Sequence, residues 1–144
     1  MLATGLGIDT TFDDTSVSIL RGKHEILANL TLSQYKDHEE FGGVVPERAS
    51  RKHLEVIHLL IDEALKKADI NFTGIDYIAV SNHPGLMGSL LVGLTVAKSL
   101  AYSLGCPIIG INHVEAHPYA NVLEHGEMHF PILHLVVAGG HTLL

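Results

Sequence analysis

The sequence predicts an α/β fold in which a mixed β-sheet is flanked by helices. Three observations support this prediction: three short strand-like segments open the chain, helix and strand patterns alternate after them, and the composition is that of a globular domain. Of the 144 residues, 47% are hydrophobic and 17% are charged, so one sizeable core can form without disulfides or a structural metal. The single cysteine, Cys106, excludes an internal disulfide.

The first part of the chain predicts three antiparallel strands and one helix. Turns that contain polar residues or glycine separate the three strand segments, which are residues 2–8, 15–20 and 25–32. After a break at Gly42-Gly43, Pro46 precedes a pattern of apolar residues at helical spacing that runs to Ala68.

The remainder of the chain predicts alternating strands and helices. We expect strands at residues 75–80, 108–111 and 132–137, helices at 88–104 and 115–123, and the start of another strand at Thr142. The resulting order, β-β-β-α-β-α-β-α-β, is typical of a ribonuclease H-like core.

The charge balance limits the classes of partner. Nine Lys plus Arg against sixteen Asp plus Glu give a net charge of −7, which repels a nucleic-acid backbone. A nucleic-acid partner would therefore need basic surfaces outside this chain. Because the sequence shows no leader pattern and no uncharged apolar stretch near the roughly 20 residues that span a bilayer, we expect a soluble, cytoplasmic protein with no membrane partner.

Two of the eleven histidines, His113 and His117, lie four residues apart. On a helix they share a face and could bind one metal ion, although two ligands do not complete a site. Glu115 lies roughly opposite them on a helical wheel, so it is poorly placed as the general base of a zinc peptidase. The alternative is a chance spacing, with one histidine hydrogen-bonded in the core. Most of the other histidines have no partner at ligand spacing and are assigned to the surface or to a satisfied core; these are His24, His38, His53, His58, His125, His129 and His134.

Two strand ends carry further candidate ligand groups. Asp9, Thr10 and Thr11 follow the first strand in a turn that can place amides and a carboxylate beside a nucleotide phosphate or its metal. Val136–Gly140 ends another strand in a glycine pair, followed by His141. The alternative for both segments is an ordinary turn. For the glycines of residues 84–93, a packing role is favoured over phosphate contact.

Taken together, the segments GIDTTFDDT, FGGVVPERASRKH, HPGLMGSLLVG, NHVEAH and LVVAGGHT resemble, in order and spacing, the TsaD family of tRNA threonylcarbamoyladenosine synthase subunits. This family was formerly called O-sialoglycoprotein endopeptidase or glycoprotease. The GGVVPE and HVEAH motifs of this sequence are similar to those of its bacterial-type branch. The resemblance implies the ASKHA fold of actin, Hsp70 and sugar kinases, with two ribonuclease H-like subdomains. Residues 1–134 would form the amino-terminal subdomain and residues 135–144 the truncated start of the second, so that only the amino-terminal half is present.

The resemblance also implies roles for individual residues. His113 and His117 would bind one divalent metal, iron or zinc, whose third protein ligand, an aspartate, lies outside this chain. The residues that would line the substrate pocket are Val136, Val137, Ala138, Gly139 and Gly140. The residues near the nucleotide would be Asp9, Thr10, Thr11 and His141. Ala138 stands where the family commonly has serine, and Phe12 where it commonly has cysteine; no catalytic residue is assigned.

By resemblance, the parent enzyme moves a threonylcarbamoyl group from threonylcarbamoyl-adenylate to the exocyclic amine of the adenosine 3′ of the anticodon. Its partners would be tRNA, a paralogous ASKHA subunit and an ATPase subunit. This fragment alone is expected to be inactive and to form a homodimer through apolar surface that normally faces the missing lobe. Two alternatives are a non-catalytic scaffold subunit of the same complex and a metal-dependent glycoprotein endopeptidase.

Overall fold

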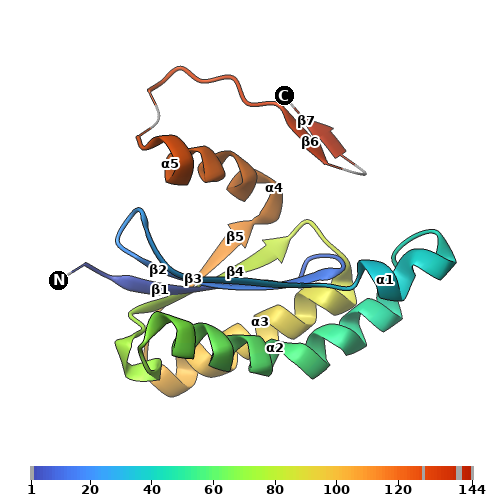
Figure 1. Ribbon diagram of the computed structural model, residues 1–144, viewed down its shortest axis with the longest axis horizontal. Helices are drawn as coiled ribbons and strands as arrows, with labels where there is room; N and C mark the ends of the chain where they lie inside the picture. Colours follow the sequence, from blue (N-terminus) through green and yellow to red (C-terminus); the bar gives the residue numbers. More distant parts are fainter. Residues whose placement is uncertain (1, 128, 139–140, 144) are drawn as a thin grey trace.

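A five-stranded mixed sheet organises the computed structural model, which describes residues 2–127, 129–138 and 141–143 (Figure 1). The strand order is β3-β2-β1-β4-β5. The strands are β1 Thr4–Asp9, β2 Asp14–Arg21, β3 Glu25–Ser33, β4 Tyr77–His83 and β5 Ile108–Asn112. The first three strands pair antiparallel, whereas β4 runs parallel to both β1 and β5. The predicted mixed sheet is therefore confirmed.

Two long helices cover one face of this sheet, and a run of short helices follows β5. The helices are α1 Tyr35–His38, α2 Pro46–Ala68, α3 Met87–Leu104, α4 His113–Ala116 and α5 Ala120–His125, with 3₁₀ helices at Glu39–Phe41, Phe72–Gly74 and His117–Tyr119. In Figure 1, α2 and α3 lie below the sheet, and α4 and α5 lie above it. A separate antiparallel pair consists of β6 Val136–Ala138 and β7 His141–Leu143.

The hydrophobic core lies between the sheet and the α2–α3 layer. Side chains alternate along each strand, so every second residue of β1, β2 and β4 points to this layer. The strand residues buried in this way are Leu6, Ile8, Val17, Ile19, Ile78 and Val80, and they form one cluster with Ile57, Ile61 and Leu65 of α2 and Ala97 and Ala101 of α3. Burial of such side chains is the main stabilising contribution to the fold.

The opposite face of the sheet carries small and polar side chains. Gly7, Ser16, Ser18, Asn29 and Ala79 line a cavity of about 230 Å³ there, which Ala116 of α4 also borders. The two faces thus differ in chemistry as the alternating sequence predicts. Among the described residues, α3 alone is long and apolar enough to cross a membrane by length and composition, and here it packs with α2 and β4.

Two of the predicted elements differ clearly in extent from the sequence prediction. Strand β4 continues through residues 81–83, which had been predicted as a loop, because β5 supplies a pairing partner as far as Asn112. The helical run after β5 begins at His113 because the Asn112 side chain accepts hydrogen bonds from the amides of Val114 and Glu115, at 2.9 and 3.3 Å. It is broken into short pieces around Pro118, which opens a 3₁₀ turn.

The predicted strand at residues 132–137 is wrong over most of its length. Only β6 is a strand, and it pairs with β7 rather than with the main sheet. Leu133 and Leu135, whose apolar side chains suggested a buried strand, are 82% and 62% exposed. An apolar pattern alone does not make a strand where no neighbouring strand accepts its hydrogen bonds.

Glycine at two positions allows α3 and its leading loop to approach β1 closely. A Cβ atom on Gly93 would lie 2.5 Å from Oγ1 of Thr10, and one on Gly85 would lie 2.7 Å from the carbonyl oxygen of Thr11. The amide of Gly93 donates to the same Thr10 hydroxyl at 3.2 Å. The packing role expected for this glycine-containing segment is confirmed.

We expect Gly93→Ala to lower the free energy of unfolding by about 1–3 kcal/mol, although alanine is the better helix former, because the added methyl group overlaps Thr10. Urea unfolding measures the change. Gly43→Ala is the control, since a Cβ there meets no atom within 4 Å. Equal stability of the two variants would contradict this account of the packing.

Candidate metal site

The loop that follows β1 is fixed by three different elements. The amide of Leu86, just before α3, donates to the carbonyl of Thr11 at 2.9 Å. Nε2 of His53, from α2, donates to the carbonyl of Phe12 at 2.9 Å. The backbone amide of Gln34, directly after β3, donates to the carbonyl of Asp13 at 3.0 Å. Successive carbonyls are thus bound by separate parts of the fold, which holds the loop in one conformation.

Asp9 lies at the carboxyl end of β1, where the ends of β4 and β5 meet it. Its Oδ2 accepts hydrogen bonds from Oγ of Ser81 in β4 at 2.8 Å and from Nδ1 of His113, directly after β5, at 2.7 Å. Its Oδ1 accepts from both the amide and the hydroxyl of Thr11 at 2.8 Å. The parallel arrangement of β1, β4 and β5 therefore brings together residues more than 70 positions apart.

The charge of Asp9 follows from these contacts. Burial raises the pKa of its carboxyl group, but the hydrogen bonds and charge of His113 and the hydrogen bonds of Thr11 outweigh burial and lower the pKa from 3.8 to about 2. Asp9 is therefore an anion at neutral pH and can only accept. Nδ1 of His113 must carry the proton of this hydrogen bond, so when the ring is neutral its lone pair is on Nε2.

His117 presents its ring in the same way. Its Nδ1 lies 2.8 Å from the backbone carbonyl oxygen of His113, and since a carbonyl only accepts, Nδ1 carries the proton here too. The two rings stand edge to face with centroids 4.7 Å apart. Both histidines thus keep Nε2 as a free electron-pair donor on neighbouring rings.

The chemistry of this donor set suits a transition metal. Neutral imidazole nitrogen is a common ligand of zinc and iron, and a ligating histidine usually donates its other ring N–H to a carboxylate or a backbone carbonyl. His113 and His117 show one of each. In the part of the chain that the structure describes, no cluster of three or more His, Cys, Asp or Glu side chains could hold a metal ion. The pair therefore supplies two ligands, with Asp9 behind one of them.

A cavity of about 330 Å³ opens beside the histidine pair. Its lining residues are Asp9, Thr11, Phe12, Asp13, Asp14, Ser16, His113 and His117. The Phe12 ring also stands edge to face with His113, with centroids 5.8 Å apart. The cavity offers three carboxylates and two imidazoles to any ligand that enters it.

The structure places the other predicted site residues in different ways. Thr10 points toward α3, where its hydroxyl donates to the carbonyl of Ser89 at 2.7 Å. Val136 is half-buried and Val137 exposed in β6. The backbone of Ala138 pairs with that of His141, and Gly139 and Gly140 lie outside the described residues.

Ser81, Asn112 and Phe12 also shape the site, although the sequence did not predict roles for them there. Ser81 lay in a segment interpreted as a loop, so its contact with Asp9 followed only from the extension of β4. The signal for Asn112 was available, because an asparagine just before a helical segment is a favoured N-cap residue.

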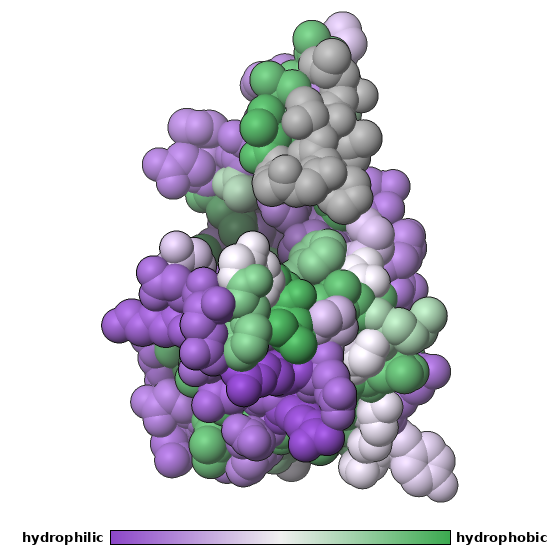
Figure 2. Space-filling model, turned by 90° about the vertical axis from the view of Figure 1, so that its right-hand side faces the viewer, coloured by the Kyte–Doolittle hydropathy of each residue, from purple (hydrophilic) through white to green (hydrophobic). Residues whose placement is uncertain are grey.

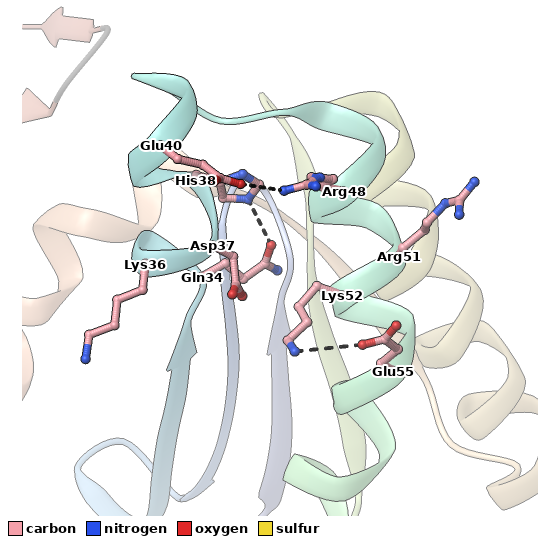
Figure 3. Close-up of a pocket in the computed structure, with 9 residues that line it drawn as sticks. All are labelled: Gln34, Lys36, Asp37, His38, Glu40, Arg48, Arg51, Lys52 and Glu55. Carbon is pink, nitrogen blue, oxygen red and sulfur yellow. Dashed lines mark hydrogen bonds and ion pairs between the residues drawn. The ribbon is translucent and has the colours of Figure 1, made fainter.

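Another cavity, of about 540 Å³, lies elsewhere, between α1 and the first turns of α2 (Figure 3). Its lining combines four cationic and three acidic side chains, among which Arg48 pairs with Glu40 at 3.3 Å and Lys52 with Glu55 at 3.8 Å. These pairs are exposed and contribute little to stability. The cavity shares no lining residue with the one beside the histidines.

The low pKa of Asp9 predicts a specific acid sensitivity. The stability that its charged form provides is fully present above pH 3.8 and is lost as the pH falls toward 2, an effect of about 2 kcal/mol. In urea unfolding, the stability difference between the wild-type chain and Asp9→Asn should shrink by about 1.5 kcal/mol between pH 6 and pH 2.5. A difference that does not change with pH would contradict the assignment.

Comparisons with known proteins agree with this fold and with the motifs. Similar solved structures include YeaZ from Pseudomonas aeruginosa, with a TM-score of 0.62 and 21% identity over 86% of this chain and 50% of that one. A RuvC from T. thermophilus in complex with a Holliday junction substrate has a TM-score of 0.51 and 13% identity, over 81% of this chain and 68% of that one. At these identities the likeness concerns the fold alone, and it supports the expected ribonuclease H-like subdomain of the ASKHA fold.

Sequence relatives are closer. The tRNA N6-adenosine threonylcarbamoyltransferases of Clostridioides difficile (strain 630) and Geotalea daltonii are each 50% identical over 139 residues, 96% of this chain. The chain spans about two fifths of their length, 41% and 40%. A family model described as TsaD, tRNA N6-adenosine threonylcarbamoyltransferase, matches residues 25–144. On this match, and on the motifs that the fold gathers around Asp9 and His113, the chain belongs to the TsaD family.

Proposed function

We propose that this chain supplies the histidine pair of the metal site in an enzyme that transfers a threonylcarbamoyl group from threonylcarbamoyl-adenylate to the exocyclic amine of the adenosine 3′ of the anticodon. The observation that carries the proposal is the orientation of His113 and His117, whose Nδ1 atoms are both engaged so that both Nε2 atoms are free. The names of the relatives give the reaction class.

One divalent metal, zinc or iron, would be bound by Nε2 of both histidines and by a third protein ligand outside this chain. When bound, it would supply Lewis-acid stabilisation for charge that develops on the carbonyl oxygen of the transferred group. Asp9 keeps His113 in the required tautomer and raises the basicity of its Nε2. Thr11 and Ser81 keep the Asp9 carboxylate in place, and the adjoining cavity gives a ligand access to the histidines.

The endopeptidase alternative would use Glu115 as its general base, and Glu115 does not lie at the histidine pair. Glu115 is exposed and accepts a hydrogen bond from the Asn112 amide group at 3.2 Å. It does not line the cavity beside the histidines, so it cannot activate a water molecule there. A purely scaffolding subunit would not require two oriented imidazoles, and their arrangement therefore favours the transferase.

We also propose that tRNA, a paralogous subunit of the same fold and an ATPase subunit act with this protein. The apolar side chains of Leu54, Leu59, Met87 and Leu91 are more than half exposed on α2 and α3, which gives a partner apolar surface to cover. In isolation, two copies of this chain would pair through the apolar surface that faces the second lobe of the parent enzyme, and sedimentation at micromolar concentration would detect that dimer. A net charge of −7 places most of the tRNA contacts on other surfaces.

Metal binding tests the site directly. We expect the chain to bind Co²⁺, used as a probe for zinc or iron, and His113→Ala or His117→Ala to remove the absorption band of the bound ion. Asp9→Asn should weaken the affinity by about 10- to 100-fold, because it removes the group that orients His113. His125→Ala, which changes an exposed histidine of α5, is the matched control. Wild-type affinity in both histidine variants would overturn the site.

The reaction is tested with a family chain of full length that carries these residues, together with its partner subunits. Transfer of labelled threonylcarbamoyl to tRNA should fall at least 100-fold in His113→Ala and remain unchanged in His125→Ala. Full transfer by the His113 variant would refute the proposed function, and transfer by this chain alone would refute the need for a third metal ligand outside it.

A further inference from the structure

A cluster of buried, hydrogen-bonded polar side chains connects the loop before α2 to the loop beside the histidine pair. His53 is fully buried, and Gln34 and His38 are exposed by 1% and 4%. Figure 3 shows Gln34 and His38 at the base of the cavity between α1 and α2, joined by their hydrogen bond. Among the described residues, every buried side-chain nitrogen and oxygen has a partner. A polar cluster of this kind is costly to bury unless each bond is made, so its geometry is tightly defined.

Backbone groups at the two ends fix the direction of every bond in this cluster. The Phe12 carbonyl can only accept, so Nε2 of His53 carries a proton and Nδ1 is an acceptor. That Nδ1 accepts from the Thr15 hydroxyl at 2.7 Å and from Nε2 of Gln34 at 3.3 Å. His53 is therefore held as one neutral tautomer.

The same logic continues to the far end. Oε1 of Gln34 accepts from Nε2 of His38 at 3.2 Å, and Nδ1 of His38 accepts from the amide of Val45 at 3.3 Å. The second N–H of the Gln34 amide group donates to the Ala49 carbonyl at 3.4 Å. Burial lowers the pKa of His53 more than the Phe12 carbonyl and the nearby aspartates raise it, which agrees with a neutral ring.

Phe12 is where this cluster meets the candidate metal site. Its carbonyl is bound by His53, while its ring packs edge to face with His113. The preceding residue, Thr11, donates both its amide and its hydroxyl to Asp9, the carboxylate that orients His113. Ser89 gives the Phe12 carbonyl a longer second contact, at 3.4 Å. The hydrogen bond from His53 is thus the short anchor that α2 provides for the loop.

We propose that His53 is a positioning residue for the His113–His117 site. Its Nε2–H holds the Phe12 carbonyl, and through it the Thr11 and Asp9 contacts that set the tautomer and direction of His113. The consequence for metal affinity rests on the proposed function, whereas the effect on the loop does not. The hydrogen bonds of His53 go to Thr15, Gln34 and Phe12 and not to His113 or His117, so it acts through the loop.

Two substitutions test the roles of the two ring nitrogens of His53 separately. His53→Gln places an N–H donor where Nε2 stands, and His53→Asn places an acceptor where Nδ1 stands and leaves the Phe12 carbonyl without its short bond. We expect His53→Gln to bind Co²⁺ within about 3-fold of wild type, and His53→Asn to bind at least 10-fold more weakly. Hydrogen exchange of the Thr11 amide should be at least 10-fold faster in His53→Asn. His58→Asn, an exposed histidine of the same helix, is the matched control.

The outcomes distinguish this proposal from the proposed function. Equal affinity and equal Thr11 exchange in the two His53 variants would overturn the positioning role and leave His53 as a core residue only. If the wild-type chain fails to bind Co²⁺, the metal site fails, and the exchange of Thr11 still decides the role of His53. If the variants do not fold, ¹⁵N spectra of the wild-type chain decide: a proton on Nδ1 of His53 would overturn the proposal.

Discussion

The contact between the Asp9 carboxylate and the His113 ring is the interaction on which the site depends. It joins the first strand of the sheet to the residue that follows the last strand, 104 positions later. It exists because β1, β4 and β5 run parallel and end at the same edge. The same carboxylate binds Thr11 and Ser81, so one anion organises groups from three strands and fixes which nitrogen of His113 is available.

The sheet supports this edge through the contrast between its two faces. One face is filled by Leu6, Val17 and Ile78 and their neighbours, which α2 and α3 cover. The other face carries glycine, serine and asparagine, and these residues line a cavity. The apolar face supplies the burial that stabilises the domain, and the polar face leaves room for ligands at the strand ends. Stability and binding are thus assigned to opposite sides of a single layer.

Much of this arrangement was predictable from sequence because it depends on local patterns. The alternation of β2 and the periodicity of α2 gave elements close to the observed ones, and the spacing of His113 and His117 indicated a shared face. The interpretation failed where pairing partners decide the structure. Strand β4 extends to His83 because β5 lies beside it. Residues 132–135 form no strand because no other strand lies beside them. For His53, the sequence left a surface role and a satisfied-core role open, and it contained no sign that the partner of this side chain is the Phe12 carbonyl.

The buried polar cluster begins at the backbone amide of Val45 and ends at the backbone carbonyl of Phe12, and this has a further consequence. An amide can only donate and a carbonyl can only accept, so the row of bonds between them has one polarity and no mirror arrangement of equal energy. Neither histidine can exchange its proton position alone without setting two donors or two acceptors against each other. The cluster therefore has a single arrangement of protons. The loop beside His113 takes a defined orientation from it, and no Asp, Glu, Lys or Arg is buried among the residues that the structure describes.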